Sequence, residues 1–438
     1  MEAFQDVASS NSHEVSQSRS RQIRARTARR WLKKMGFSFG EVKKDVYVDG
    51  HEREDVVKYR NEEFLPAWKE FSRRMVVFKE DGIWEKPLGL HPDEKPLVLI
   101  THDESTFNAN DGKRQVWTEN GKQPLRPKGR GKGIMVSGFL TPGGVLKVAN
   151  NVSKEDLLHQ QAWPCDDDNG EPIREALLYL EYGKDNYWTG EKMVNHTANV
   201  AIPIFEQAFP GCQGLFAFDN ASNHSSFATD ALLAVRMNLG PGGKQPLLRD
   251  GFDYVRGAPQ RMVFDDGHPL AGKAKGIKVV LQERGLWRER QPNGSKFCLT
   301  CPKPGCDPTH NGDCCATTLL QSQKDFQEQR GWLQEKVEAA GHRVLFYPKF
   351  HCETNFIERF WCSAKHYARE NCDYSLVGLR KTVPLSLKSV PTATINRYFN
   401  RCKQTIEAYD QGFQYGTKEF SQQIQYKSHR QVVDKSKW

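Results

Sequence analysis

Three carboxylates in this chain stand where acids that bind metal ions are expected. Asp103 follows the apolar run Leu97–Ile100, and Asp219 follows a second apolar run, LFAF. Glu358 lies in PKFHCETNFIERFWCSAKHYAREN, residues 348–371, where a helix is expected to start. Hard divalent cations such as Mg²⁺ take oxygen ligands from separate elements, and pairs of such ions carry out phosphoryl transfer. The alternative is ordinary, because an acid after a strand is also a turn or helix-capping signal.

The hydrophobic pattern predicts the elements that position these acids. Buried strands are expected at 97–100 and 215–218, a hairpin turn at Gly143-Gly144, and a short strand at 343–348. Helices are expected at residues 27–35, 51–75, 195–209, 226–237 and 324–341, from about 355, and from 375 to about 411.

The composition excludes several classes of protein. The chain has 438 residues, of which 38% are hydrophobic, so it can hold two or three domains and is not globally disordered. No apolar stretch approaches the roughly 20 residues that span a bilayer, and the N-terminus lacks the apolar core of a secretory signal. We therefore expect no membrane partner and a reducing compartment, where the eleven Cys are thiols or metal ligands. The net charge of +9 suits a polyanionic partner.

Three motifs, taken in order, resemble the catalytic motifs of DDE transposases, most closely those of the mariner-like superfamily. They are HDEST around Asp103, FDNASNH around Asp219 and NFIERFW around Glu358. The chain is also similar to the DDE endonuclease-like proteins of fungal genomes. Matched residue by residue, the resemblance implies that these three acids are catalytic and hold Mg²⁺ or Mn²⁺. His224 takes the family's histidine position, where it would contact the scissile phosphate or position a metal ligand; a capping or packing role is the alternative.

The resemblance implies an α/β fold, a ribonuclease-H-like mixed sheet flanked by helices, with an N-terminal helix-turn-helix-like segment and a Cys-rich insertion. It implies a nuclear transposase, expected as a homodimer, that cuts double-stranded DNA at element ends and joins the ends to target DNA. A catalytically inactive, transposase-derived DNA-binding protein is the alternative. The expected segments are a mobile tail (1–18), a helical DNA-binding remnant with a linker helix (19–80), the first part of the catalytic domain (90–239), a Cys-rich insertion (240–321), the rest of that domain with C-terminal helices (322–412), and a basic tail (413–438).

Two departures from the family's pattern concern the third acid. It lies 139 positions after the second acid, farther than in the family, so the insertion must loop out of the sheet. Phe356 stands where the family usually has Pro, and Glu353 stands where it has Asp, which makes Glu353 a rival third ligand. We favour Glu358 because Asn355 and Trp361 fix the register of the motif.

His102 and Glu104 flank Asp103 in the first motif. Because side chains alternate along a strand, both are expected to point away from the side of Asp103. We therefore expect them to influence the site only indirectly.

Two basic stretches are candidates for contact with DNA. The basic helix at 27–35 resembles a recognition helix, whose Arg and Lys side chains can bind phosphates or guanine; a solvated face or a nuclear-import signal is the alternative. The run 122–132 lies in a Gly-rich loop and could follow a DNA backbone, or it is a solvated loop. The predicted DNA-binding residues are Arg26, Arg29, Arg30, Lys33, Lys34, Lys128, Arg130 and Lys132.

The Cys-rich stretch FCLTCPKPGCDPTHNGDCCA, residues 297–316, predicts a structural Zn²⁺ site. A C-x2-C pair is half of a tetrahedral zinc site, and later thiolates can complete it. The spacing matches no standard zinc ribbon, and a set of free or buried thiols is the alternative. The candidate ligands are Cys298, Cys301, Cys306, Cys314 and Cys315.

Overall fold

The computed structural model describes residues 25–35, 50–113, 125–166, 169–182, 187–221, 224, 226–290, 296–301 and 314–425. The chain divides into two compact units, Met1–Asp49 and Gly50–Trp438. In the first unit, helix α1 (Ala25–Lys34) confirms the predicted basic helix, and its Arg and Lys side chains are exposed. The tail predicted at 1–18 lies outside the described residues. None of the helices in the described ranges is long and apolar enough to cross a membrane.

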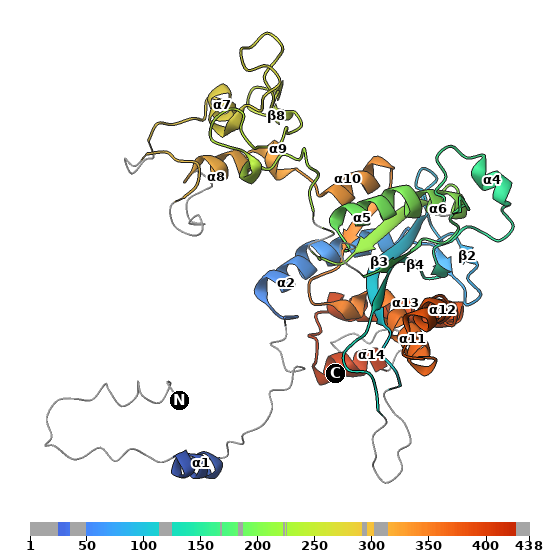
Figure 1. The fold of residues 1–438 in the computed structure, drawn as a ribbon. Helices are drawn as coiled ribbons and strands as arrows, with labels where there is room; N and C mark the ends of the chain where they lie inside the picture. The colour runs from blue at the N-terminus through green and yellow to red at the C-terminus, as the bar shows by residue number, and fades with distance from the viewer. Residues whose placement is uncertain are drawn as a thin grey trace, which may run out of the picture. The chain divides into compact units, whose positions relative to one another are not determined.

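The second unit is built on a mixed β-sheet flanked by helices, as predicted (Figure 1). Its strands are β3 (Leu97–Asn108), β4 (Gly133–Thr141), β5 (Gly144–Val145), β6 (Leu177–Glu181), β7 (Gln213–Phe218) and β10 (Arg343–Phe346). The strand order is β10-β7-β3-β4-β5, and β6 also pairs with β4. The first three strands in this order are parallel, whereas β4 is antiparallel to β3, β5 and β6.

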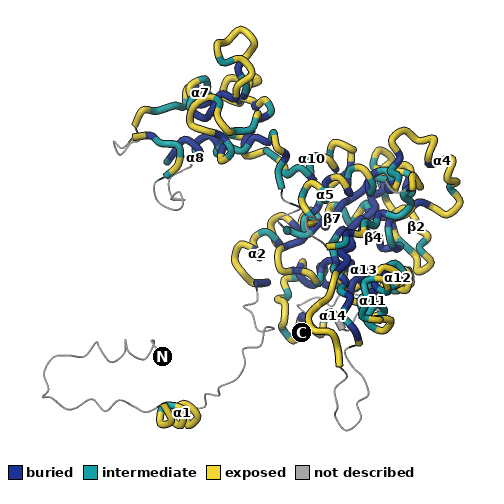
Figure 2. Tube along the Cα trace, viewed as in Figure 1, coloured by how far each residue is buried: buried dark blue, intermediate teal, exposed yellow. Residues whose placement is uncertain are grey.

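Both faces of the sheet are covered, which explains the unbroken apolar run at the start of β3. Leu97 and Leu99 belong to one cluster of buried side chains, and Val98 and Ile100 belong to another. Because successive side chains point to opposite faces, a strand that is covered on both sides needs apolar residues at every position. Figure 2 shows the same burial along β4, in which every residue is buried.

Two sets of helices cover the two faces of the sheet. On the face of Leu97 they are α2 (Glu54–Tyr59), α3 (Leu65–Ser72), α11 (Ile357–Glu370), α12 (Leu376–Lys388), α13 (Thr392–Asp410) and α14 (Lys418–Gln425). On the face of Val98 they are α4 (Lys154–Leu158), α5 (Gly190–His196), α6 (Ile202–Ala208) and α10 (Trp332–Ala339). Single π-helical turns, Arg60–Phe64 and Thr197–Ala201, join α2 to α3 and α5 to α6. The smaller elements are β1 (Val77–Phe78), β2 (Trp84–Glu85) and a 3₁₀ turn at Cys352–Thr354.

The region between β7 and α10 has a hydrophobic core of its own. Leu232, Val280 and Phe326 belong to a third buried cluster, which is separate from the two clusters around the sheet. Because this region buries its own apolar side chains, it can separate the second and third acids in sequence without entering the sheet. Its elements are a 3₁₀ turn (Ala234–Arg236), β8 (Gly251–Asp253), β9 (Ala258–Gln260), α7 (Gly276–Glu283), α8 (Ala316–Gln321) and α9 (Lys324–Gln327).

Three local predictions are wrong. The segment 226–237 forms only the 3₁₀ turn, because its apolar residues pack individually into the third cluster. The helix expected at 324–341 is two helices, because Gly331 has an extended backbone and starts α10 anew. The strand that carries Asp103 does not end there: antiparallel pairing with β4 extends it to Asn108.

A buried ion pair holds the third cluster together. Arg284 donates to both oxygens of Asp325, over 2.9 and 2.6 Å, and both side chains are almost fully buried. In Asp325→Ala the guanidinium stays buried without its carboxylate, a loss that costs about 3–5 kcal/mol. We therefore expect amides of α7 and α8 to exchange with solvent much faster in this variant, as measured by hydrogen-exchange mass spectrometry.

Asp265→Ala is the matched control. It removes an ion pair with Arg261 in the same region, but that pair is exposed, and such pairs contribute little. Amide protection that is unchanged in Asp325→Ala would contradict this role of the buried pair.

Candidate active site

Asp103 and Asp219 stand at the same level of two neighbouring parallel strands. The pairing of β3 with β7 runs as far as Thr101 and Ala217, so each acid lies two positions beyond the last pair. Side chains at one level of parallel strands point to the same face of a sheet. The two carboxylates therefore leave the sheet together, at the point where β7 ends and β3 continues alongside β4.

Helix α11 brings the third carboxylate to the same place. The hydroxyl of Thr101 donates to Oδ1 of Asn355 over 2.6 Å, which fixes the start of the helix against β3. One turn later, Trp361 donates its indole Nε1–H to Oδ2 of Asp103 over 3.0 Å. Residues three apart on a helix share a face, so Glu358 lies on the side of α11 that Trp361 turns toward Asp103.

The indole of Trp361 fits because β4 has a glycine opposite Asp103. Gly138 is the residue that pairs with Asp103. A Cβ atom at this position would lie 3.1 Å from a ring carbon of Trp361 and 3.1 Å from the side chain of Leu177. A larger residue would push the indole away from the carboxylate that it binds.

The three carboxylates repel one another. Burial raises the pKa of Asp103 well above its usual range, and the charges of Glu358, Glu104 and Asp219 raise it further. Burial also raises the pKa of Glu358, and Asp219 adds to this effect while Lys365 opposes it. A divalent cation would remove the repulsion, so this donor set of oxygens fits Mg²⁺ or Mn²⁺.

An open cleft gives access to two of the acids. Asp219 and Glu358 line it, together with Lys349 and Phe350. Within the described residues, the three acids are not among the sets whose ligand atoms all lie within 4.8 Å of one another. One ion held by all three acids would therefore need their side chains to move.

His224 positions the carboxylate of Asp219. Its Nδ1 lies 2.5 Å from Oδ1 of Asp219, and its Nε2 lies 3.7 Å from Oε1 of Glu104. Burial alone would raise the pKa of Asp219, but the hydrogen bond and charge of His224 outweigh burial and lower it. Burial alone would lower the pKa of His224, but the two carboxylates raise it to about 10.

Glu353, the rival third acid, is engaged elsewhere. Its Oε1 accepts from Tyr409 over 2.6 Å and lies 2.7 Å from Nδ1 of His351, and its Oε2 lies 3.3 Å from Nε2 of His51. Burial alone would raise the pKa of Glu353, but His351 and Tyr409 lower it. This carboxylate links the segment before α11 to α13 and is not among the residues that line the cleft.

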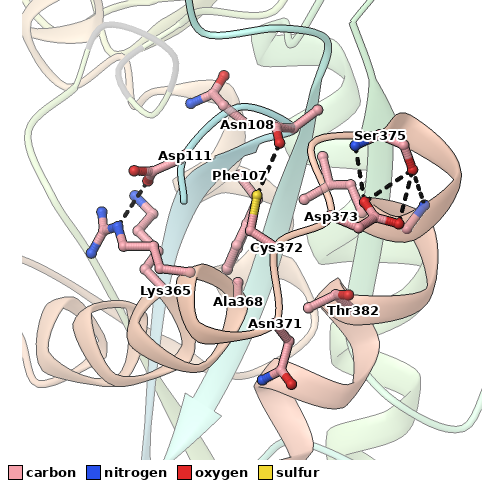
Figure 3. A pocket seen from close by; sticks show the side chains of 14 residues that line it. Phe107, Asn108, Asp111, Lys365, Ala368, Asn371, Cys372, Asp373, Ser375 and Thr382 are labelled. Atoms are coloured by element: carbon pink, nitrogen blue, oxygen red, sulfur yellow. Dashed lines mark hydrogen bonds and ion pairs between the residues drawn. The ribbon is translucent and has the colours of Figure 1, made fainter. Parts of the chain in front are cut away.

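A second polar cluster fixes the far end of α11 to the residues that follow β3 (Figure 3). Arg369 donates to Oδ2 of Asp111 over 2.9 Å, and the thiol of Cys372 donates to the carbonyl oxygen of Ala109 over 3.2 Å. These contacts surround a small cavity between the end of β3, α11 and α12. With the ends of α11 tied to β3 and to the residues that follow it, the position of Glu358 relative to Asp103 is fixed by the fold.

The basic loop residues extend the strand pair that carries Asp103. The carbonyl oxygens of Lys132 and Arg130 accept hydrogen bonds from the backbone N–H groups of Ala109 and Asn110. Lys128, like these two basic residues, is exposed. Residues 114–124 of the same loop lie outside the described residues.

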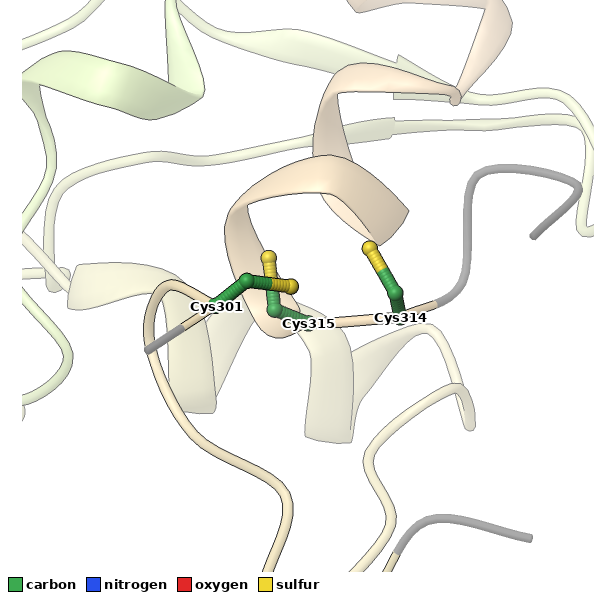
Figure 4. Close-up of side chains that lie close together, drawn as sticks. All are labelled: Cys301, Cys314 and Cys315. Atoms are coloured by element: carbon green, nitrogen blue, oxygen red, sulfur yellow. The ribbon is translucent and has the colours of Figure 1, made fainter. Parts of the chain in front are cut away.

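Three of the five predicted zinc ligands lie close together (Figure 4). The sulfur atoms of Cys301, Cys314 and Cys315 are all within 4.8 Å of one another, just before α8. Cys298 is not in this set; its thiol donates to the carbonyl oxygen of Thr300 over 3.0 Å. Cys306 lies outside the described residues.

The structure also brings together three residues whose proximity was not predicted from the sequence. His102 and Glu104 lie on one face of β3 and meet His224, with ligand atoms within 4.8 Å of one another. The alternation His-x-Glu in HDEST is the sequence pattern that could have indicated this group. No local sequence pattern predicts that His224, which follows β7, lies beside these two residues.

No protein-family model matches the sequence, and no curated protein matches it. Among solved structures, the chain is similar to a Mos1 transposase paired-end complex with left transposon end, with a TM-score of 0.39, 10% identity, and coverage of 93% of this chain and 85% of that chain. A Mos1 mariner paired end complex with Mn gives a TM-score of 0.39 and 11% identity over 94% and 87% of the two chains. The Mos1 strand transfer complex gives 0.37 and 10% over 88% and 69%. Because these TM-scores and identities are low, we infer the function from the residues of the site.

Asp103→Asn is expected to raise the free energy of unfolding of the metal-free protein at neutral pH. A carboxyl with a raised folded pKa stabilises the fold fully only below its unfolded pKa of about 3.9, and this contribution is lost as pH rises through the folded pKa. Each tenfold difference in proton affinity between the folded and unfolded states corresponds to about 1.4 kcal/mol. Asparagine removes the charge and keeps an oxygen for Trp361. Urea unfolding at a series of pH values, from about 4 to 8, measures the difference between variant and wild type.

Asp219→Asn is the matched control, with the opposite sign. The pKa of Asp219 is lowered by its pairing with His224, so its charge stabilises the fold at neutral pH. This variant should be less stable than wild type at pH 7. Loss of stability in both variants to the same extent would contradict the description of Asp103 as a repelled, buried charge.

Proposed function

We propose that this chain is a metal-dependent DNA endonuclease and strand transferase of the transposase type. One observation carries the proposal: Asp103 and Asp219 lie at one level of two neighbouring strands, and helix α11 brings Glu358 near them. The charges of Glu358 and Asp219 accordingly raise the pKa of Asp103. Their sequence contexts are the three motifs that resemble the DDE pattern. Phosphoryl transfer by two metal ions needs such a group of acids.

Asp103, Asp219 and Glu358 would together hold two Mg²⁺ or Mn²⁺ ions. When bound, such ions lower the pKa of an attacking water or hydroxyl and stabilise the leaving oxygen. The rest of the chain orients the acids: Trp361 binds Asp103, and His224 binds Asp219. The cleft beside Asp219 and Glu358 leaves room for a phosphodiester.

The proposed reaction consists of two phosphoryl transfers. In the first, water attacks a phosphorus atom at an element end, the bond to the 3′ oxygen breaks, and that oxygen takes a proton. In the second, the freed 3′ hydroxyl attacks a phosphorus atom in target DNA and displaces another 3′ oxygen. Neither step needs a covalent bond to the protein, so no Ser or Tyr nucleophile is assigned.

The basic side chains support double-stranded DNA as the substrate. Those of α1 and of Lys128, Arg130 and Lys132 are exposed, and clusters of this kind bind phosphates with release of counterions. The second group follows directly from the strand pair that carries Asp103. A DNA substrate also suggests a nuclear location, which a fluorescent fusion of the full chain would reveal.

Nicking of supercoiled plasmid by the purified chain tests the proposal. We expect nicking with Mg²⁺ or Mn²⁺ and none with EDTA. Glu358→Gln removes a metal ligand with little change in shape, and we expect the rate to fall by about 10²-fold or more. Glu370→Gln, at the other end of α11, removes only an exposed ion pair with Lys113 and should leave the rate unchanged.

Two outcomes would contradict the assignment. Equal rates in wild type and Glu358→Gln would remove Glu358 from the site. A folded protein that binds DNA in a salt-dependent way, yet does not nick it with either metal, would favour the alternative of a transposase-derived DNA-binding protein without catalytic activity.

We also propose that Cys301, Cys314 and Cys315 hold a structural Zn²⁺, with the fourth ligand unassigned. Three thiolates within 4.8 Å of one another fit the tetrahedral sites that zinc prefers. By elemental analysis we expect Cys314→Ser to hold about one zinc ion per chain fewer than wild type. Cys165→Ser, which alters a thiol far along the sequence from this group, is the control. Zinc content that is equal in wild type and Cys314→Ser would rule out this site.

A further inference from the structure

A second group of ligand atoms lies on the face of β3 opposite Asp103. His102 and Glu104 are two positions apart on the strand, so they share the face that Asp103 does not use. His224 reaches this face from the segment after β7. One ligand atom from each of the three residues lies within 4.8 Å of the other two.

One ring nitrogen of His102 has no hydrogen-bond partner among the residues that the structure describes. Its Nε2 lies 2.7 Å from Oγ of Ser137, and that hydroxyl lies 2.9 Å from Nδ1 of His196. The residue is 0% exposed, yet its Nδ1 has no hydrogen-bond partner in the described part of the chain. If Nε2–H donates to Ser137, then Nδ1 carries a lone pair with no donor to accept from. Buried polar atoms are rarely left in this state, so the lone pair points to a missing ligand.

Within the described ranges, His224 also has one buried ring nitrogen without a hydrogen bond, although this nitrogen faces the carboxylate of Glu104. Its Nδ1 is used by Asp219, while its buried Nε2 has no hydrogen-bond partner among the described residues. The nearest acid oxygen, Oε1 of Glu104, is 3.7 Å away, which is too far for a hydrogen bond. Trp188 donates its indole N–H to that oxygen and so orients the carboxylate toward the two rings. A cation between these atoms would satisfy both nitrogens and the carboxylate at once.

A third group of this kind in the second unit differs in its hydrogen bonds. His51, His351 and Glu353 also have ligand atoms within 4.8 Å of one another. There, however, His351 uses both ring nitrogens, because Nδ1 bonds Glu353 and Nε2 lies 3.3 Å from Nη1 of Arg60. Both ring nitrogens of His351 therefore have partners within the protein, and neither is left to bind a metal ion.

We propose that Nδ1 of His102, Nε2 of His224 and the carboxylate of Glu104 bind one divalent transition-metal ion, separate from the ions of the three catalytic acids. Two imidazoles and a carboxylate suit Zn²⁺, Co²⁺ or Fe²⁺, whereas Mg²⁺ takes oxygen ligands. Histidines that bind a metal usually donate their other N–H to a carboxylate. His224 has this arrangement, with Asp219 as the acceptor.

The proposed site gives His224 a positioning role. With the ion bound, Nε2 holds the metal and Nδ1–H holds Asp219, so the ring fixes the orientation of a catalytic acid from behind. Without the ion, the ring instead carries a proton on Nε2 and faces Glu104 as an ion pair. This role rests on the proposed function of Asp219, whereas the metal site itself does not.

Co²⁺ binding to the full chain, without DNA, tests the site. One equivalent of Zn²⁺ is first added, which the soft thiolates take up in preference to imidazole. The visible absorption of Co²⁺ then reports nitrogen ligands in a site of low coordination number. We expect this absorption in wild type. In Glu104→Gln and in His102→Asn the affinity should fall at least about tenfold, because even loss of a residue behind a ligand costs that much. Circular dichroism verifies that each variant is folded.

Two further variants make the test specific. Glu358→Gln alters only the group of three acids, so its Co²⁺ absorption should match that of wild type. His342→Asn controls for loss of a buried histidine. Among the described residues Nε2 of His342 also lacks a hydrogen-bond partner, and it lies 3.6 Å from Oε1 of Glu206.

Three results would overturn the proposal: no visible absorption in wild type, absorption that survives in both Glu104→Gln and His102→Asn, or absorption that is lost only in Glu358→Gln. The readout involves neither DNA nor strand cleavage. Failure here would therefore leave the proposed endonuclease standing, and failure of plasmid nicking would leave this site standing.

Discussion

Repulsion among three carboxylates is the constraint on which the rest of the second unit depends. Burial makes the charge of Asp103 costly, and Glu358 and Asp219 add to that cost. Trp361 donates a hydrogen bond to Asp103, and His224 lowers the pKa of Asp219. A fold that needed only stability would replace these acids with apolar or neutral residues. Their retention within a tightly packed sheet makes sense if a cation completes the arrangement.

Packing supplies the rigidity that this repulsion requires. β3 is covered on both faces by separate hydrophobic clusters, which hold the strand that carries Asp103 in place. Helix α11 is tied to β3 at its start through Asn355, and to the residues that follow β3 at its end through Arg369. The long segment between the second and third acids buries its own core and leaves this frame undisturbed. Contacts far from the three acids thus keep these carboxylates close together in spite of their repulsion.

The sequence predicted the parts of this site that have local patterns. The apolar runs before Asp103 and Asp219 indicated buried strands, and both are strands. The end of β3 was not predictable in the same way, because the polar residues after Asp103 stay in the strand only through pairing with β4. The helix expected at 226–237 failed for a related reason, since a tertiary core that the sequence does not reveal competes with local helix preference.

The same distinction holds for individual side chains. Motifs indicated Asp103, Asp219 and Glu358 because each acid has a recognisable neighbourhood. The partners of Glu353 could not be predicted, because His51 and Tyr409 are far from it in sequence. The meeting of His102 with His224 likewise depends on strand pairing. Sequence patterns therefore suggest the chemistry, while the fold decides which groups can take part in it.

Anomalous diffraction from crystals of the full chain soaked in Mn²⁺ would show whether the three acids hold metal ions. We expect manganese peaks beside Asp103, with Asp219 and Glu358 among the ligands, and none beside Glu353. Peaks that are absent from the three acids at saturating Mn²⁺, or that lie beside Glu353 instead of Glu358, would contradict this assignment.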